Sequence, residues 1–588
     1  MRRVSKVTLL LLVFSPIWAP AQSRGGGGHP PSYTDPATNA RNAAVLGTGG
    51  NITGPYGGVH SARDETKVEF RTQTVLVQVP VVVADKSGKH VRGLDENDFA
   101  VLENGKPVKV EHFEELTGDS APIALQAATP GTFNNLALDP SHPHNIVVIA
   151  LDTVNTPFLD QAYGRRELVK FLGQTVNASQ VLSLMLITSR GLRVVQGLSN
   201  DPASLVAVLK KVGGETSPME TESVDAQADL AAGTIQSGLH QISGMDPMTA
   251  MNNFVDYGDP LEAQFLQENA IETTMNAFLG IAWSLQGVPG RKSLIWATGG
   301  FPFSIFSPDD IPGGHLSSLY ERAMLALNEA QIAVYPVDIR GLTPGPIGSG
   351  RGGKMSAQQM VNRAWLQQGG FDTLNEFADM TGGKAFYNTN DLAGSFRRAA
   401  DDGATYYMLS YYLDTKNGKP GWRKLSVKVN RPGIEIRART GFLVTNTTMN
   451  PRLTRDLDMI NALHSPIEGT GIPVTVQWVG AVADGTKKKA SFFAHMAAGG
   501  LSFDPAGRDQ LNFDFAAIAF DKNGKEVAQS AQNFSKPVPE AQLASVRTNG
   551  VGFRNSLELL PGTYTVRFVV RDNVTGKIGS VTAPLTVN

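Results

Sequence analysis

A chain of 588 residues is too long for a single hydrophobic core, so we expect roughly three or four domains. Its 52 basic and 54 acidic residues nearly cancel, which excludes the basic field that recruits nucleic acid. Because the chain contains no cysteine, disulfides, thiolate zinc sites, iron–sulfur clusters and a cysteine nucleophile are all excluded.

The N-terminus has the pattern of an export signal. Basic residues precede an apolar run from Val7 to Trp18, and Ala19-Pro20-Ala21 supplies a small-residue cleavage site. The run is too short for a membrane anchor and Pro16 interrupts it, so we predict a cleaved signal peptide over residues 1–21. No later stretch is apolar enough to span a bilayer. We therefore expect a bacterial periplasmic or secreted protein without a membrane span after cleavage.

The next segments predict a leader and a β-rich unit. Residues 22–65 are rich in Gly, Ser, Pro, Asn and Thr, which predicts a disordered leader. Residues 66–116 show strand alternation, and Asn104-Gly105 between two apolar runs indicates a tight hairpin. After a linker at 117–143 and a long α/β region, strand patterns return at 404–444. We assign them with 66–116 to one discontinuous β-sandwich, because insertion between neighbouring chain ends is a common way to nest domains.

Residues 144–403 alternate strand and helix patterns, which predicts a doubly wound, mostly parallel sheet. Its first strand, Ile146–Leu151, is a continuous apolar run typical of a strand buried on both faces. Later patterns predict helices at roughly 226–242 and 261–285 and a last strand at 382–387. Glycine-rich turn signals at regular spacing through residues 465–588 predict a C-terminal β-sandwich.

Asp152 follows the first strand of the α/β region directly, at the end where open α/β sheets bind ligands. Residues 144–156 resemble the first strand and metal-binding turn of a von Willebrand factor type A domain. In that family the turn reads Asp-x-Ser-x-Ser, and its oxygens hold a divalent metal. Here the five positions are Asp152, Thr153, Val154, Asn155 and Thr156.

The resemblance implies a metal site that has lost ligands. Asp152 and Thr156 match the family, whereas Val154 has no ligating atom. The threonine expected from a following loop is Thr216, with Ser199 as the alternative. The family acid after the fourth strand would fall at Gly299. We therefore expect weak or no binding of Mg²⁺ or another divalent cation. The structural alternative is that Asp152 caps the following turn or helix.

The whole pattern resembles a narrower group, the VWFA-related domain family found in acidobacteria, whose members are exported. The resemblance spans about residues 68–444. Its marks here are Val79-Pro80-Val81-Val82-Val83, Leu94 to Asn104, Leu151 to Thr156, Gly290-Arg291-Lys292, Thr381-Gly382-Gly383 and Arg439-Thr440-Gly441-Phe442. The resemblance implies a fold and an exported location, but fold alone does not determine function.

Enzyme interpretations have little support in the sequence. It contains no Gly-x-Ser-x-Gly elbow and no His-Glu-x-x-His helix, and His142 and His144 flank a proline in a predicted linker. We therefore expect a non-enzymatic binding or adhesion-type protein that contacts a protein or glycan of the cell envelope. The predicted contact residues are Asp152, Asn155, Thr156, Thr298 and Gly299. The alternatives are a structural envelope protein and, with less support, a secreted hydrolase.

Overall fold

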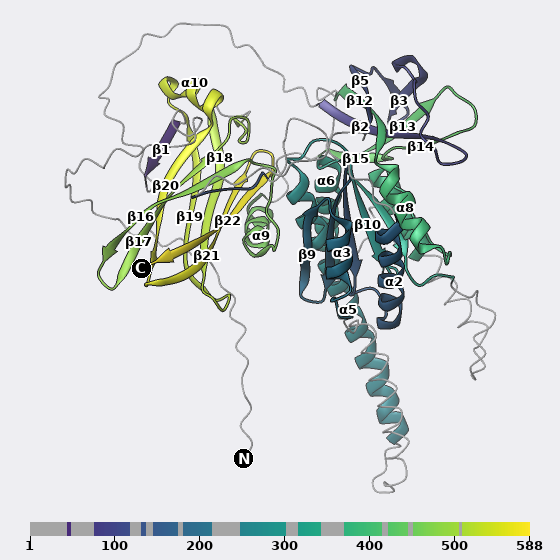
Figure 1. Ribbon diagram of the computed structural model, residues 1–588, viewed down its shortest axis with the longest axis horizontal. Coiled ribbons are helices and arrows are strands. Elements are labelled where there is room, and N and C mark those ends of the chain that lie inside the picture. The colour runs from purple at the N-terminus through teal and green to yellow at the C-terminus, as the bar shows by residue number, and fades with distance from the viewer. Residues whose placement is uncertain are drawn as a thin grey trace.

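The computed structural model describes residues 44–48, 76–117, 131–136, 145–174, 180–214, 247–301, 315–342, 370–413, 421–444, 451–504 and 509–588. Residues 44–48 and 247–264 are described by their backbone alone. The described chain forms several sheets flanked or joined by helices (Figure 1). This arrangement confirms the predicted multi-domain combination of α/β and all-β units.

The sheet of the α/β unit has five strands in the order β11-β10-β7-β8-β9. Four strands run parallel, and all their residues are buried: β7 (Asn145–Asp152), β8 (Gln180–Thr188), β10 (Lys292–Thr298) and β11 (Ile332–Asp338). The edge strand β9 (Gly191–Ser199) is antiparallel to β8. Burial on both faces explains why β7 is a continuous apolar run instead of an alternating one.

Two helical layers cover this sheet, and alternate residues of β7 face opposite layers. Val147, Ile149 and Leu151 pack in the layer formed by α2 (Phe158–Gln174), α3 (Pro202–Leu209) and α8 (Leu392–Asp402). Ile146, Val148 and Ala150 pack in the layer formed by α5 (Pro247–Leu285), α6 (His315–Glu329) and a helix at residues 370–381. The sheet is therefore covered on both faces, as a mostly parallel sheet requires.

Strands from before and after the α/β unit pair with each other. One sheet has the order β14-β2-β12-β5, formed by β14 (Ile434–Arg437), β2 (Leu76–Asp85), β12 (Thr405–Tyr412) and β5 (His112–Thr117). The other has the order β15-β13-β3-β4, formed by β15 (Gly441–Val444), β13 (Gly421–Val429), β3 (Phe99–Glu103) and β4 (Lys106–Val108). The two share one core that contains Val79, Val101, Tyr407 and Leu425.

The C-terminal part of the chain also forms two sheets around one core that contains Phe492, Phe515 and Phe568. The first sheet includes β20 (Val551–Leu559), β17 (Lys487–Met496) and β16 (Val474–Asp484). The second has the order β19-β18-β21-β22, with β19 (Glu526–Pro537), β18 (Gln510–Phe520), β21 (Gly562–Asp572) and β22 (Ile578–Val587). Two helices accompany them, α9 (Pro451–His464) and α10 (Glu540–Asn549).

Several predicted boundaries differ from the structure. The predicted linker contains β6 (Thr132–Asn134), which pairs with β16 and so belongs to the C-terminal sheet. The predicted leader contains β1 (Ala44–Thr48), which pairs in parallel with β20, and the rest of that leader lies outside the described residues. Helix α5 begins at Pro247, well before the predicted start at 261, and the helix predicted at 226–242 lies outside the described residues. The strand predicted at 382–387 is a single bridge between Val337 and Phe386.

The C-terminal part contacts the α/β unit closely. Asp458 on α9 accepts a hydrogen bond from Arg571 Nε of β21 at 3.0 Å and pairs with Arg322 of α6. A Cβ placed on Gly287 would lie 2.0 Å from the carbonyl oxygen of Thr470, so the two backbones meet without room for a side chain there. Among the described helices, none is both long enough and apolar enough to cross a membrane.

Candidate functional site

Asp152 is the last residue of β7, and its carboxylate is buried under the turn that follows. Its Oδ1 accepts hydrogen bonds from the backbone amides of Val154 and Asn155, each at 3.0 Å. The carboxylate therefore caps its own turn, which is the structural alternative considered from the sequence.

The second carboxylate oxygen of Asp152 is held by side chains from two elements. Oδ2 accepts from Asn155 Nδ2 at 2.7 Å and from the indole Nε1 of Trp296 at 2.9 Å. Thr298 Oγ1 lies 3.0 Å from the same oxygen. Trp296 and Thr298 are on β10, the neighbouring parallel strand, so the strand register places both donors at the correct edge. Both carboxylate oxygens are thus occupied by protein donors.

Trp296 is itself fixed by an aromatic cluster. Its ring makes T-shaped contacts with Phe278 of α5 at a centroid distance of 5.2 Å and with Phe377 at 5.5 Å. Asn155 extends the connection, because its Nδ2 also lies 3.0 Å from Thr274 Oγ1 on α5. The Asp152 turn is therefore joined to the helical layer that contains α5.

Thr156 and Gly299 close the turn against β10. Thr156 is fully buried, and its Oγ1 accepts a hydrogen bond from the backbone amide of Gly299 at 2.7 Å. A Cβ on Gly299 would lie 2.8 Å from the carbonyl oxygen of Asn155 and 3.0 Å from Thr156 Cα. Position 299, where the type A resemblance would place an acid, is therefore too crowded for a side chain.

We expect Gly299→Ala to lower the free energy of unfolding by about 1–3 kcal/mol, because its methyl group must displace backbone atoms. Gly173→Ala is the control, since nothing lies within 4 Å of a Cβ at that helical position. Chemical denaturation of the full chain measures both variants. Equal stability of Gly299→Ala and wild type would contradict the conclusion that position 299 has no room for a Cβ atom.

The structure brings the five predicted contact residues together, but mostly inside the molecule. Asp152, Thr156 and Thr298 are almost completely buried, and Asn155 is half-buried. These side chains therefore stabilise the turn from beneath the surface, and they expose little area to which a ligand could bind directly. Thr216, predicted as a metal ligand, lies outside the described residues.

Ser199, the alternative ligand, is at the wrong edge of the sheet. Because β9 runs antiparallel to β8, it carries the chain from the carboxyl edge back toward the amino edge. Ser199 lies opposite Leu182, whereas Asp152 lies opposite Ile187. The interpretation of Ser199 as a ligand is therefore wrong.

The electrostatics of Asp152 are those of a buried, hydrogen-bonded acid. Burial raises the pKa of Asp152 above its ordinary value, while hydrogen bonds from Asn155, Trp296 and Thr298 oppose that rise by favouring the charged form.

The residues present do not fit a divalent cation at this turn. Hard cations need several oxygen ligands with free lone pairs. Here Val154 is aliphatic and buried, Asp152 accepts hydrogen bonds on both oxygens, and Gly299 has no room for an acid. Across the described ranges, no cluster of three or more His, Asp or Glu side chains is placed to hold a metal.

A second acid at the same edge was not predicted. Asp338 ends β11 and pairs in register with Thr298. Its carboxylate is fully buried and accepts a bidentate pair of hydrogen bonds from Arg340, Nε at 2.9 Å and Nη2 at 2.8 Å. The sequence could have predicted this position, because Asp338 ends an apolar strand pattern just as Asp152 does.

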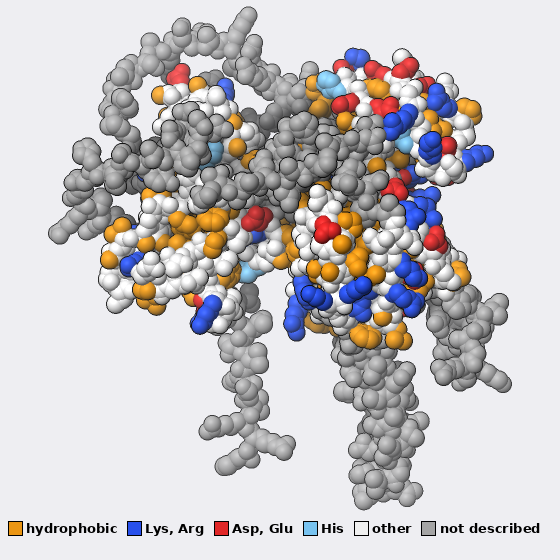
Figure 2. Space-filling view, viewed as in Figure 1, with side chains coloured by type: hydrophobic (Ala, Val, Ile, Leu, Met, Phe, Trp, Pro, Cys, Tyr) orange, Lys and Arg blue, Asp and Glu red, His pale blue; other side chains and the backbone are white. Residues whose placement is uncertain are grey.

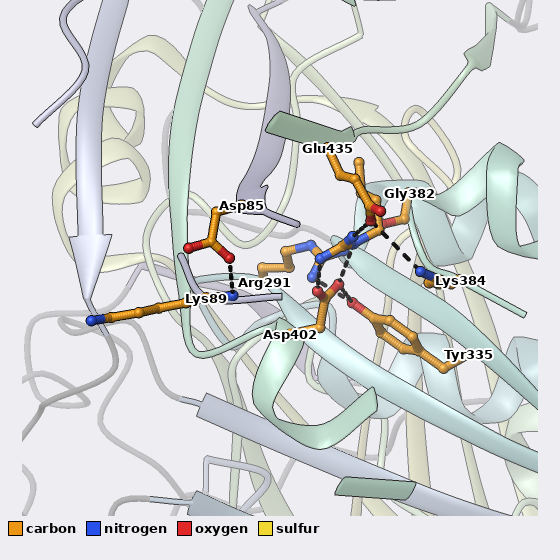
Figure 3. Close-up of polar contacts among 9 residues, drawn as sticks. Asp85, Lys89, Arg291, Tyr335, Gly382, Lys384, Asp402 and Glu435 are labelled. Carbon is orange, nitrogen blue, oxygen red and sulfur yellow. Dashed lines mark hydrogen bonds and ion pairs between the residues drawn. The ribbon is translucent and has the colours of Figure 1, made fainter. Parts of the chain in front are cut away.

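A polar cluster lies at the opposite, amino edge, where the α/β unit meets the strands of the sandwich (Figure 3). Asp402, at the end of α8, accepts a hydrogen bond from Tyr335 Oη at 2.6 Å and from Arg437 Nε of β14 at 3.0 Å. Arg291 donates to Tyr335 Oη at 2.8 Å and also to the carbonyl oxygen of Gly382. Because Asp402 lies three residues before β12, these hydrogen bonds fix the chain where it leaves the α/β unit and enters the sandwich.

Lys292, which follows Arg291 in the sequence, carries a buried amine at the start of β10. Its Nζ donates to the carbonyl oxygen of Val288, and burial lowers its pKa from 10.5 to about 7. No group in the described part of the chain forms an ion pair with it within 4 Å.

We expect Lys292→Met to raise the free energy of unfolding at pH 7 by about 1–4 kcal/mol. Between pH about 7 and 10.5 the unfolded chain binds a proton at Lys292 that the folded chain does not, so wild-type stability falls as the pH is lowered through that window. The variant should lose this part of the pH dependence. Urea denaturation at several pH values measures it, with the exposed Lys428→Met as control. Parallel pH profiles for wild type and Lys292→Met would show that the amine does not titrate as stated.

Comparisons with known proteins identify neither family nor function. A scan against protein-family models finds no match, and a search of curated proteins finds none either. A glycosyl hydrolase family 2 member from Bacteroides cellulosilyticus DSM 14838 is 14% identical, with 32% of this chain and 20% of that chain covered and a TM-score of 0.15. The chain thus spans about one fifth of the length of that structure, and a similar share of the Bacteroides uniformis β-glucuronidase.

Two other solved structures cover more of the chain at equally low similarity. The pilus adhesin SpaC from Lactobacillus rhamnosus GG is 9% identical, with 85% and 74% coverage and a TM-score of 0.22. The ArnB paralog VWA2 from Sulfolobus acidocaldarius is 8% identical, with 84% and 76% coverage and a TM-score of 0.18. These scores are too low to carry an inference about fold or activity.

Proposed function

We propose that the chain is an exported, non-enzymatic binding protein of the cell envelope, whose type A-like α/β unit contacts a protein or glycan without a bound cation. The order of the sheet and the position of Asp152 at its carboxyl edge support the resemblance to the VWFA-related domain family. The basic n-region and short apolar run at the N-terminus support export.

One observation carries the proposal, an exposed apolar patch beside the closed turn. Leu159 is 77% exposed, Phe158 is 43% exposed and Leu342 is 57% exposed. Phe158 and Leu159 begin α2 directly after the turn, and Leu342 follows the end of β11. Asn390 connects the start of α2 to the residues after β11. Its carbonyl oxygen accepts a hydrogen bond from Tyr163 Oη at 3.3 Å, and its side chain accepts one from the backbone amide of Leu342. Phe158, Leu159, Tyr163 and Leu342 are called the carboxyl-edge patch below.

The patch suits a binding role for two physical reasons. Large exposed apolar side chains grouped at one site mark interaction surfaces, and the carboxyl edge is where open α/β sheets bind ligands. The buried Asp152 network beneath it fixes the backbone of the turn, so the patch is presented with little ordering cost.

The charges around the patch favour a partner with acidic groups. Helix α2 contributes Arg165, whose Nη1 donates to the carbonyl oxygen of Val212, and the residues after α3 contribute Lys210 and Lys211. Arg166 and Lys170, further along α2, are paired with Glu167. Figure 2 shows basic side chains gathered among hydrophobic ones over α2 and α3 on the face in view. Complementary charges raise the association rate and discriminate against wrong partners.

Saturable capture from cell-envelope extract of the producing bacterium by the immobilised full chain tests the proposal. We expect Leu159→Lys to reduce capture about tenfold or more, because it removes a large apolar contact. Val482→Lys is the matched control, since Val482 is 69% exposed on β16 of the C-terminal part. Thermal denaturation shows that both variants are folded. Equal capture by Leu159→Lys and wild type would exclude the patch.

A structural role in the envelope is the second candidate, and the close packing between units favours it. The backbones of Gly287 and Thr470 meet closely, and Asp458 pairs with both Arg322 and Arg571. These contacts hold the C-terminal part against the α/β unit, and a structural spacer requires such fixed packing between its units. A spacer of this kind should capture no saturable partner from the extract, so the same experiment separates the two candidates. A hydrolase would instead turn over substrates in an ester, peptide and glycoside panel, and we expect no turnover.

A further inference from the structure

Strand β1 comes from the N-terminal leader, yet it lies in the C-terminal part of the molecule. The five-stranded sheet there has the order β1-β20-β17-β16-β6, so β1 is the only neighbour of β20 on its outer side among the described strands. Figure 1 shows the purple β1 beside β20, among green and yellow strands of the C-terminal part. Without β1, the outer N–H and C=O groups of β20 would form an open edge, which is a template for another strand.

The part of β20 that β1 covers offers backbone groups more than side chains. The residues of β20 in register with β1 are Val551, Gly552 and Arg554. Val551 and Phe553 pack in the core of the C-terminal part, and Gly552 between them has no side chain. Recognition at this edge therefore depends mainly on main-chain hydrogen bonds, as is usual when a strand is added to a sheet edge.

The pairing with β1 is the weaker of the two that β20 makes. Strand β17 pairs antiparallel with β20 along its whole length, from Val551 to Leu559. Strand β1 pairs in parallel, reaches only Arg554, and its register shifts between Val45 and Thr48. Parallel pairing is slightly less stable per residue, and ordering a segment of a Gly- and Ser-rich leader costs conformational entropy. Release of β1 is therefore a local opening that leaves the core intact.

We propose that the outer edge of β20 is a strand-addition site for an extended, uncharged peptide segment of a partner, and that β1 competes with this partner within the chain. The sequence of β1 defines the ligand, because Ala-Val-Leu-Gly-Thr carries no charge and no proline that would remove a backbone donor. Residues 49–75 lie between β1 and β2, so β1 can leave β20 without displacing β2. The site is independent of the carboxyl-edge patch, which lies on the α/β unit.

Competition by β1 lowers the apparent affinity of the site in the intact chain. A ligand that binds only the open edge has an apparent Kd equal to its intrinsic Kd divided by the fraction of open molecules. If β1 covers the edge in about nine-tenths of the molecules, its release strengthens binding about tenfold. The leader therefore acts as an autoinhibitory strand.

Fluorescence anisotropy of a labelled peptide of residues 40–52, titrated with the full chain, measures this competition. The variant Val45→Pro/Leu46→Pro releases β1, because successive N–H groups of a strand face opposite sides and one of the two lost donors faces β20. We expect this variant to bind the peptide about tenfold more tightly than wild type. The matched control is Ala37→Pro/Thr38→Pro, earlier in the leader, which should bind as wild type does.

Two results would overturn the proposal. The first is the same peptide binding, or none, for wild type and for Val45→Pro/Leu46→Pro, because β1 would then cover no strand-addition site. The second is undiminished binding of a peptide that carries the same two prolines, because main-chain pairing requires the donors that proline lacks.

A designed disulfide tests the same site in a second way, since the chain has no cysteine of its own. Thr48 and Arg554 are register partners, so Thr48→Cys/Arg554→Cys should form an intramolecular disulfide under mild oxidation. The matched control is Thr48→Cys/Glu558→Cys, because Glu558 is exposed on the same face of β20, further along the strand. We expect the disulfide to abolish peptide binding and its reduction to restore binding. Cross-linking of both pairs at equal rates, or undiminished peptide binding to the cross-linked chain, would contradict the proposal.

Discussion

Asp152→Ala is expected to lower the free energy of unfolding by about 3–5 kcal/mol. The substitution leaves the indole of Trp296, the Asn155 amide and two backbone amides without their acceptor in a buried site. It also frees the turn from α5, because the link from Asn155 to Thr274 depends on the position of Asn155. Urea denaturation followed by tryptophan fluorescence measures the loss.

Two further variants make this result specific. Asp152→Asn keeps one acceptor oxygen but turns an amide donor toward other donors, so we expect an intermediate loss of about 1–3 kcal/mol. Asp401→Ala removes an exposed acid of the same unit and should have little effect. If Asp152→Ala were as stable as Asp401→Ala, the carboxylate would not hold the turn.

Asp402→Ala is expected to cost about 2–4 kcal/mol and to loosen the junction between the α/β unit and the sandwich. Without Asp402, Arg437 loses the contacts that its Nε and Nη2 make with that carboxylate. Tyr335 loses the acceptor of its hydroxyl, Asp402 Oδ2 (Figure 3). Both side chains of the ion pair are mostly buried, so solvent compensates little of the loss. Chemical denaturation gives the stability change.

Limited proteolysis reports on the junction itself. We expect Asp402→Ala to be cleaved near residues 403–405 faster than wild type, because the hydrogen bonds of Asp402 lie directly before β12. Asp401→Ala is again the control. Unchanged cleavage together with unchanged stability would show that the cluster is dispensable.

Local signals in the sequence predicted part of this structure well. The apolar run before Asp152 forms the fully buried strand β7. Asn104-Gly105 forms the expected hairpin turn, with φ of 49° and 79°, the positive values that a tight turn of this type requires.

Contacts between residues far apart in the chain could not be predicted. Trp296 and Thr298 reach Asp152 only because β10 and β7 are neighbours, which no local pattern specifies. Ser199 was misplaced because its position depends on the direction of β9. Strand β6 was missed because three residues, Thr132–Asn134, carry too short a pattern, and their pairing with β16 is non-local.

The turn after β7 illustrates both limits. The sequence showed Val154 and Gly299 at ligand positions, which predicted a weakened site. It could not show that Trp296 and Asn155 occupy the carboxylate, or that Gly299 is enclosed by the backbone of Asn155 and Thr156. Those two facts change the expected role of Asp152 from a ligand to a structural cap.

Titration calorimetry of the purified full chain with Mg²⁺, Mn²⁺ and Ca²⁺ tests this role most directly. We expect no saturable heat with any of the three cations and no change in Tm when they are added or chelated. Saturable binding of one cation that Asp152→Asn abolishes would contradict the claim that hydrogen-bond donors of the protein alone occupy the Asp152 carboxylate.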